Sequence, residues 1–310
     1  MSSEMLYARD YYGNALVELG KKNDKVVVLD ADLSGSTRTA KFAKEFPERF
    51  FNMGVAEQNM MGVASGLASC GNVAFASTFA MFASGRAWEQ IRNTIAPNYL
   101  NVKIIATHAG ITVGEDGSSH QANEDIAIMR AIPNMRVIVP ADANETFEVI
   151  KLIARIDGPF YVRMGRSKSP VIKERKKFEF GKGQVLSQGK DVCVIACGTM
   201  VSEALKAMRI LKEEKGMEIT VVNMPTIKPI DEKLIIDMAK KHKKIITCEE
   251  HSIIGGLGSA VSEALSENAP IELKRIGVRD VFGQSGPPNE LMAYYGLTAQ
   301  DIVNEVIGKS

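Results

Sequence analysis

Short runs of uninterrupted apolar residues recur along this chain and restrict the folds it can adopt. VVVL at 26–29 and VCVIA at 192–196 are long enough for strands but too short for helices. A strand that is apolar on both faces is typical of a parallel sheet covered by helices. Eight segments are predicted strands: 25–30, 73–77, 102–107, 136–139, 160–163, 191–196, 219–223 and 244–248.

Helical patterns separate these strands, at 7–20, 56–69, 85–95, 144–154, 202–215, 231–241 and 258–265. This alternation predicts an α/β fold in which each sheet is mostly parallel and flanked by helices. A length of 310 residues exceeds that of a usual single domain. The alternation pauses at 167–189, which is rich in charge and glycine. We therefore expect two domains, at 1–175 and 185–310.

The charges are balanced, with 38 basic and 37 acidic residues and a formal net charge of +1. This balance gives no reason to expect a nucleic-acid or membrane-surface partner. No apolar segment follows a basic start, so no secretory signal is expected. The four cysteines show no zinc-type pairing with histidines, which predicts reduced thiols. Both observations favour a cytoplasmic protein.

No charged residue occurs between Gln58 and Gly85, a length that would suit a membrane span. Serine and threonine residues and the turn signal Gly71-Asn72 interrupt this stretch. We therefore expect a buried helix, a turn and a buried strand. An element enclosed on every side, as at a subunit interface, would explain the missing charges.

Polar and aromatic residues gather after three predicted strands, at the edge where parallel sheets place their sites. Glu57 begins an otherwise uncharged helix. It is either a charge that complements the helix dipole or a buried carboxyl whose raised pKa allows proton exchange. Phe79 and Phe82 follow a strand and either fill the core or form a platform for a flat ring.

His108, Asp116 and His120 lie in a glycine-rich loop. Histidines can hydrogen-bond hydroxyl, carbonyl or phosphate oxygens. We expect no metal site, because the spacings of eight and four residues in a Gly/Ser loop lack helical i,i+4 geometry. The GGLG segment at 255–258 matches neither a dinucleotide nor a P-loop pattern. It indicates tight packing or a backbone anion site of unknown ligand.

Five motifs occur in register: ADLSGST, NMGVAEQ, TFAMF, THAGITVGEDGSSHQ and IPNMRVIVPAD. Together they resemble the transketolase family. The later strings ACGTMVSEAL, CEEHSIIGGLGSAVSEAL and FGQSG resemble its C-terminal domain. The family's N-terminal domain binds the cofactor diphosphate through Mg²⁺ with a GDG and a later asparagine, and this chain has no convincing copy. The chain therefore resembles the C-terminal subunit of a split transketolase, with a pyrimidine-binding domain followed by the transketolase C-terminal domain.

The resemblance implies thiamine diphosphate as the cofactor, with the Mg²⁺ ligands on a partner subunit. It assigns Glu57 to the aminopyrimidine ring, where this carboxyl helps to activate the thiazolium carbon. It makes Phe79 and Phe82 walls of the aminopyrimidine pocket, which is more open at Gly85 than in relatives with a third aromatic residue. Asp32 falls near the thiazolium, approached across a subunit interface.

The resemblance also implies a sugar-phosphate site. His120 would contact a hydroxyl or carbonyl group, and Asp116 would recognise a sugar hydroxyl. The positions expected to hold the phosphate are His108, Ser36, Arg9 and Arg163, although Arg166 is an alternative to Arg163.

These assignments imply transfer of a two-carbon ketol unit between sugar phosphates, by a chain that is active only with an N-terminal subunit in an α2β2 assembly. Two sister activities share the architecture. One is 1-deoxyxylulose-5-phosphate synthase, and the other is the beta subunit of a 2-oxo-acid dehydrogenase. A non-catalytic assembly subunit is a further alternative.

Overall fold

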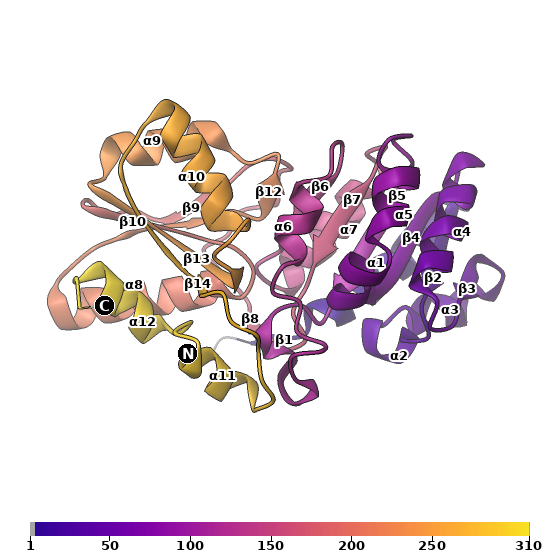
Figure 1. Cartoon of the computed structure of the whole chain (residues 1–310), viewed down its shortest axis with the longest axis horizontal. Helices are drawn as coiled ribbons and strands as arrows, with labels where there is room; N and C mark the ends of the chain where they lie inside the picture. Colours follow the sequence, from indigo (N-terminus) through magenta and orange to yellow (C-terminus); the bar gives the residue numbers. More distant parts are fainter. Residues whose placement is uncertain (1–3, 310) are drawn as a thin grey trace.

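The computed structural model describes residues 4–309 and folds them into two α/β domains that lie side by side (Figure 1). The N-terminal domain contains a seven-stranded sheet with the order β12-β6-β7-β5-β4-β2-β3. Its strands are β2 (Val26–Asp30), β3 (Phe50–Asn52), β4 (Val73–Phe79), β5 (Val102–Thr107), β6 (Arg136–Ile138), β7 (Phe160–Arg163) and β12 (Thr226–Lys228). All pairings are parallel except that of β12 with β6 at one edge.

Helices cover both faces of this sheet, which explains why its strands are apolar on both sides. Successive side chains of a strand point to opposite faces, so Val26 and Val27 enter different hydrophobic layers. One layer is formed by α1 (Ala8–Lys22), α3 (Ala40–Glu45) and α7 (Ala143–Ile153). The other is formed by α4 (Glu57–Ser69), α6 (Asp125–Arg130) and the helical segment 82–95.

The C-terminal domain contains a five-stranded sheet with the order β14-β13-β10-β11-β9, in which only β9 is antiparallel. Its strands are β9 (Gln184–Ser187), β10 (Val192–Ala196), β11 (Thr220–Asn223), β13 (Lys244–Ser252) and β14 (Glu272–Val278). Figure 1 shows α9 (Glu232–Lys241) and α10 (Leu257–Asn268) above this sheet, and α8 (Met200–Lys215) and α12 (Ala299–Val306) below it. The short helix α11 (Pro288–Tyr294) packs against the turn Ile111–Asp116 of the other domain.

All eight predicted strands are present, and the predicted helical stretch over 85–95 is helical but is not one regular α-helix. The chain instead forms a π-helical turn at Phe82–Arg86, the short helix α5 (Trp88–Gln90) and a second π-helical turn at Ile91–Ile95. Such turns often occur at functional sites. No sequence pattern indicated that β12, from the C-terminal half, joins the N-terminal sheet. The division into 1–175 and 185–310 remains our proposal.

The uncharged stretch 58–85 forms most of α4, a turn at Gly71, all of β4 and most of the π-helical turn at Phe82–Arg86. Strand β4 is buried on both faces, as expected. Helix α4 is not enclosed on every side, because Gln58, Asn59, Gly62 and Gly66 are exposed. No helix among residues 4–309 is long and apolar enough to cross a membrane.

Glu145 of α7 is fully buried between the domains. Its carboxyl group accepts the backbone N–H of Ala141 at 2.7 Å and the side-chain amide of Asn223 at 2.9 Å. Burial raises its pKa to about 7. A glutamate of an unfolded chain titrates near pH ~4.3, so between these values the folded chain holds a proton that the unfolded chain has released. The stability contributed by this proton is lost as the pH rises towards 7.

We therefore expect Glu145→Gln to gain stability relative to the wild type between pH 5 and pH 8, by up to about 3 kcal/mol. The quantity to compare is the difference in free energy of unfolding between Glu145→Gln and the wild type. Burial lowers the pKa of His108 to about 3 and that of His251 to about 4, and these groups give the opposite pH trend in both proteins. Urea unfolding at both pH values measures the difference, with Glu213→Gln on exposed α8 surface as the control. A difference that does not change with pH would contradict the expectation.

Candidate active site

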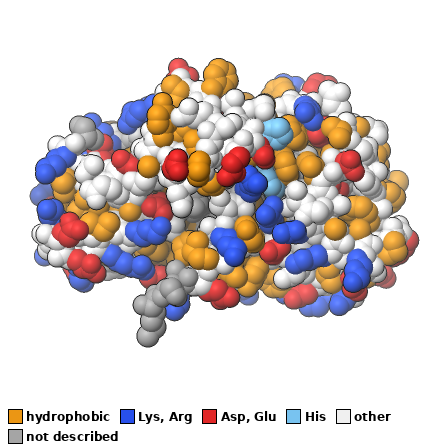
Figure 2. Space-filling view, turned by 90° about the horizontal axis from the view of Figure 1, so that it is seen from below, with side chains coloured by type: hydrophobic (Ala, Val, Ile, Leu, Met, Phe, Trp, Pro, Cys, Tyr) orange, Lys and Arg blue, Asp and Glu red, His pale blue; other side chains and the backbone are white. Residues whose placement is uncertain are grey.

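The carboxyl ends of β2, β4 and β5 bring together most of the predicted site residues. Phe79 ends β4, and its ring stacks on the imidazole of His108 with 3.8 Å between the ring centroids. The ring of Phe82 lies 5.8 Å from that of Phe79 and 5.3 Å from that of His120. Residues from three separate segments therefore form one aromatic array. Figure 2 shows histidine side chains beside lysines and arginines near the middle of one face of the molecule.

His108 is held as a neutral ring in an electropositive corner of this array. Burial, together with Arg9, Arg166 and Arg38, lowers its pKa to about 3. Its Nε2 lies 3.2 Å from a guanidinium nitrogen of Arg9 and its Nδ1 lies 2.9 Å from the Thr107 hydroxyl. A guanidinium can only donate, so Nε2 is the acceptor and Nδ1 carries the proton. This tautomer follows from the Arg9 contact.

The loop after β2 brings Ser36 to the same corner. The buried carboxylate of Asp30 accepts hydrogen bonds from the Leu33 N–H and from the hydroxyls of two threonines, Thr37 and Thr39. Arg9 donates to the backbone carbonyl of Ser36 at 3.3 Å. Asp30, which the sequence reasoning missed, thus organises the loop. Its signal was an acidic residue at the end of an apolar strand.

Asp32 lies in the same loop. Its backbone is in the left-handed region, with a φ of 62°, and its side chain is exposed. Its carboxylate accepts a hydrogen bond from the Asn52 amide, at 3.0 Å. Asp32 therefore lies on a surface that another chain can reach.

Two arginines three residues apart have different environments, and only Arg166 lies at the electropositive corner. Arg163 is 4% exposed and is paired with Asp125 at 2.9 Å. It also donates to the backbone carbonyls of Ala122 and Glu250. These contacts commit Arg163 to the interior, away from the electropositive corner at which we expected it. The side chain of Arg166 is 35% exposed.

The loop at 109–121 places its two predicted polar residues at the rim of the array. Asp116 is exposed, with a carboxylate oxygen 3.9 Å from the Arg166 guanidinium. His120 is half-buried, and its Nδ1 lies 3.0 Å from the Ser119 hydroxyl. In residues 4–309 no group of three or more His, Cys, Asp or Glu side chains has the arrangement of a metal site.

Glu57 is buried at the start of α4 and is paired with a residue that the sequence reasoning missed. Its side chain is 3% exposed, and one carboxylate oxygen accepts a hydrogen bond from Arg86 at 2.9 Å. The Arg86 guanidinium also lies over the ring of Phe82, 4.0 Å from its centroid. Glu57 and Arg86 are the charges on either side of the uncharged stretch 58–85, which was the available signal. The pocket predicted to be more open at Gly85 is therefore partly covered by the next residue.

A pocket of about 470 Å³ opens beside this pair, lined by residues of α4, its preceding turn and Arg86. The Phe82 ring does not line this pocket, and the Arg86 guanidinium lies over that ring. With Arg86 displaced, the buried Glu57 carboxyl and the Phe82 ring would suit a flat heteroaromatic ring that carries hydrogen-bonding nitrogens. The residues present therefore fit the aminopyrimidine of thiamine diphosphate.

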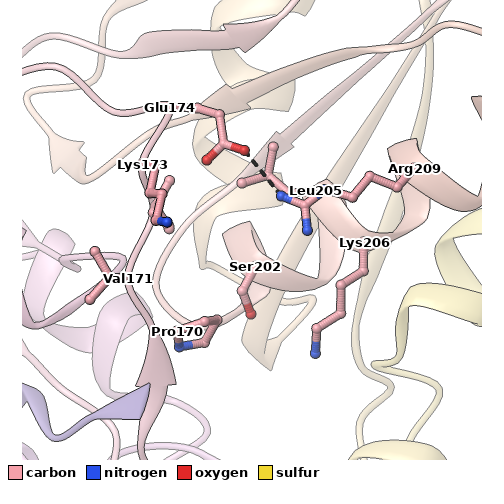
Figure 3. Close-up of a pocket in the computed structure, with 9 residues that line it drawn as sticks. Pro170, Val171, Lys173, Glu174, Ser202, Leu205, Lys206 and Arg209 are labelled. Carbon is pink, nitrogen blue, oxygen red and sulfur yellow. Dashed lines mark hydrogen bonds and ion pairs between the residues drawn. The ribbon is translucent and has the colours of Figure 1, made fainter. Parts of the chain in front are cut away.

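Another pocket, of about 330 Å³, lies between segment 170–174 and α8 (Figure 3). Two of its three cations are paired, Arg209 with Glu174 at 3.0 Å and Lys206 with Glu203 at 2.7 Å, and the third is Lys173. None of the predicted site residues lines it.

The GGLG segment at 255–258 binds a carboxylate of this chain itself. Glu249 accepts the N–H groups of Leu257 and Gly258, at 2.7 and 2.8 Å, where α10 begins. A Cβ at Gly256 would lie 1.9 Å from a carboxylate oxygen of Glu249, so only glycine fits there. The predicted anion site therefore holds an internal anion.

Two family descriptions together match nearly the whole chain. Residues 4–171 match the transketolase pyrimidine binding domain, and residues 181–302 match the transketolase C-terminal domain. The chain belongs to the transketolase family.

Individual transketolase relatives match over almost their full length. A Methanocaldococcus jannaschii protein assigned as a transketolase C-terminal section is 59% identical over 304 residues, covering 96% of this chain and 95% of the relative. A 6-deoxy-6-sulfo-D-fructose transketolase subunit of Clostridium sp. is 41% identical over 298 residues, covering 96% and 92%. A solved split-gene transketolase, an inactive β4 tetramer, has a TM-score of 0.90 and 53% identity, covering 99% and 98%. This chain therefore corresponds to the C-terminal section of a split transketolase-family protein.

Proposed function

We propose that this chain is the C-terminal subunit of a transketolase that transfers a two-carbon ketol unit between sugar phosphates. The observation that carries the proposal is the corner in which Arg9 contacts both His108 and Ser36. These three residues come from segments far apart in the sequence. The Arg9 guanidinium and the Ser36 hydroxyl can donate hydrogen bonds to a phosphate dianion, and the guanidinium adds positive charge. His108 would donate from Nε2 once the phosphate replaces it as the partner of Arg9 and the ring takes its other tautomer.

Thiamine diphosphate, when bound, supplies the nucleophilic carbon for this reaction. The carboxyl group of Glu57 would hold the proton shared with a ring nitrogen of the aminopyrimidine. Phe82 would stack on that ring, with Phe79 as the second wall. Asp32 would lie near the thiazolium across a subunit interface. We propose that the Mg²⁺ and diphosphate ligands belong to the partner subunit.

The remaining residues would bind and orient the sugar phosphate. Arg9, Arg166, His108 and Ser36 would hold its phosphate group, and Asp116 would accept a hydrogen bond from a sugar hydroxyl. His120, at the edge of the Phe82 ring, would donate to the hydroxyl or carbonyl oxygen nearest the reacting carbon. The aromatic array between the two groups would keep water from the reacting atoms.

The N-terminal subunit would pack against the side of the chain that carries Glu57 and Asp32, in an α2β2 assembly. The outer side of α4 supports this placement. It exposes Gln58, Asn59, Gly62 and Gly66, an uncharged strip whose two glycines allow another chain to approach closely.

A ketol-transfer assay with xylulose 5-phosphate and ribose 5-phosphate tests the proposal, using the chain alone and mixed with its N-terminal subunit. Turnover in the mixture alone is expected. Turnover with pyruvate instead would indicate the synthase or dehydrogenase activity. Turnover with a sulfonated ketose alone would indicate the activity named for the Clostridium relative. No turnover with any of these substrates would favour a non-catalytic assembly subunit.

Arg86 donates to Glu57 and lies over the Phe82 ring. We propose the same two contacts for the aminopyrimidine, so Arg86 and the aminopyrimidine compete for them. We expect Arg86→Ala to tighten the binding of thiamine diphosphate by the mixture about tenfold, because a charge-assisted hydrogen bond no longer has to be broken. Titration calorimetry measures the affinity. Arg92→Ala is the matched control, since Arg92 lies over Trp88 in the same segment. Weaker binding by Arg86→Ala would mean that Arg86 contributes to the cofactor site.

A further inference from the structure

Both domains hold the loop at 109–121: Met164, Arg166 and Ser167 of the N-terminal domain bond to it, and so do residues of the C-terminal domain. The side-chain amide of Gln121 donates to the backbone carbonyl of Gln284 at 3.0 Å. The N–H of Ser252 donates to the carbonyl of Asn123 at 2.8 Å. A Cβ at Gly283 would lie 1.7 Å from the side-chain carbonyl oxygen of Gln121, so the two segments are in direct contact. This loop carries Asp116 and His120 and follows His108 directly.

Glu250 makes the most deeply buried of these contacts between the domains. It lies in β13, its side chain is buried, and one carboxylate oxygen accepts the backbone N–H of Thr112 at 2.7 Å. A Cβ at Gly110 would lie 2.3 Å from the same oxygen, and Gly110 has a φ of +76°. Glycine is therefore required at 110 both for the backbone conformation and for the approach of the carboxylate.

The backbone of Glu250 is fixed by the same ion pair that removes Arg163 from the phosphate corner. Arg163 donates to the Glu250 carbonyl at 2.8 Å and to the Ala122 carbonyl at 3.1 Å, while its Nε pairs with Asp125. One guanidinium thus ties β13 to the end of the loop, and the Glu250 carboxylate ties β13 to its beginning. Buried charge-assisted hydrogen bonds of this kind hold one arrangement against alternatives.

We propose that Glu250 is a positioning residue of the sugar-phosphate site, through which the C-terminal domain holds the loop at 109–121 in its binding conformation. Glu250 acts on substrate through Thr112 and the loop. Its effect on sugar-phosphate binding rests on the proposed function, whereas its effect on the loop does not.

The adjacent glutamate provides a matched control. Glu249 is also fully buried and also accepts backbone N–H groups, but those belong to α10 of its own domain. A general loss of stability in the C-terminal domain would follow from either substitution. Loosening of the loop would follow only from substitution of Glu250.

The test compares Glu250→Met, which removes the acceptor at similar side-chain length, with Glu250→Gln, which keeps an acceptor, and with Glu249→Met. Amide hydrogen exchange on the full chain reports the loop directly. We expect the Thr112 amide to exchange about tenfold faster in Glu250→Met, and close to the wild-type rate in the other two variants. Equal exchange in Glu250→Met and wild type, or equal acceleration in Glu249→Met, would overturn the proposal.

Kinetics of the mixture with the N-terminal subunit provide the second measurement. In Glu250→Met we expect the KM for the sugar phosphates to rise about tenfold, with the half-saturating concentration of thiamine diphosphate unchanged and with recovery in Glu250→Gln. A rise in both concentrations would overturn the assignment to the sugar-phosphate site. Absence of turnover in the wild type would instead contradict the proposed function, and the exchange result would still decide the role of Glu250.

Discussion

Glutamine in place of Glu57 is expected to lower ketol transfer by the two-subunit mixture by roughly 10²–10⁴-fold, the range for loss of a positioned proton-transfer group. The side chain is 3% exposed and lines the pocket of about 470 Å³, and glutamine has nearly the same size, so the substitution removes the acid without opening a cavity. The rate of xylulose 5-phosphate consumption at saturating thiamine diphosphate and Mg²⁺ is the measurement.

Glu89→Gln is the control for this substitution, because Glu89 is an exposed glutamate of the neighbouring helix α5. It should keep wild-type activity. The thermal unfolding temperatures of both variants should stay close to that of the wild type. A loss of activity in Glu57→Gln would then reflect the missing carboxyl group and not unfolding. Full activity in Glu57→Gln would remove Glu57 from the mechanism and leave it as a partner of Arg86.

Methionine in place of Arg163 is expected to destabilise the chain by about 3–5 kcal/mol, the cost of leaving one partner of a buried ion pair uncompensated. Asp125 is 1% exposed and would keep the Tyr161 hydroxyl at 2.7 Å as a hydrogen-bond donor, but it would lose the guanidinium. Urea unfolding of the isolated chain measures the loss. Coupled to it, the loop at 109–121 should become less protected from hydrogen exchange.

For Arg166→Met we expect the opposite pattern from Arg163→Met: a small loss of stability and a clear effect on substrate binding. Arg166 is partly exposed, but it donates to the backbone carbonyl of Val113 and pairs with Glu115. The free energy of unfolding should therefore fall by about 1 kcal/mol, well below the loss in Arg163→Met. The KM for phosphorylated sugars should rise in the mixture, because a charge-assisted contact to the phosphate is lost. A stable Arg163→Met with a raised KM would restore the assignment of the phosphate to Arg163.

Much of the fold followed from local sequence patterns. The eight predicted strands are continuous apolar runs, and these runs reflect burial on both faces, which a single segment records by itself. The half-exposed strands β3, β9 and β14 lack such runs and were missed. The π-helical turns around α5 were missed because helical periodicity does not register one extra residue per turn.

The sequence predicted some residues of the candidate site and missed others. The motifs placed Phe79, Phe82, His108 and His120 at strand ends, and the structure brings their rings together. Arg86 and Glu250 were missed because their importance lies in contacts with residues 29 and 138 positions away. No local pattern records such contacts.

The sequence by itself determined the parallel α/β architecture and the family, because apolar runs, helical periods and motifs are properties of contiguous segments. Only the tertiary structure decided which arginine enters the interior and which stays at the electropositive corner beside His108, and which carboxyl group occupies the start of α10. Arg163 and Arg166 carry the same side chain. Their roles differ because the packing of two domains surrounds one of them with Asp125 and backbone carbonyls and leaves the other partly in solvent.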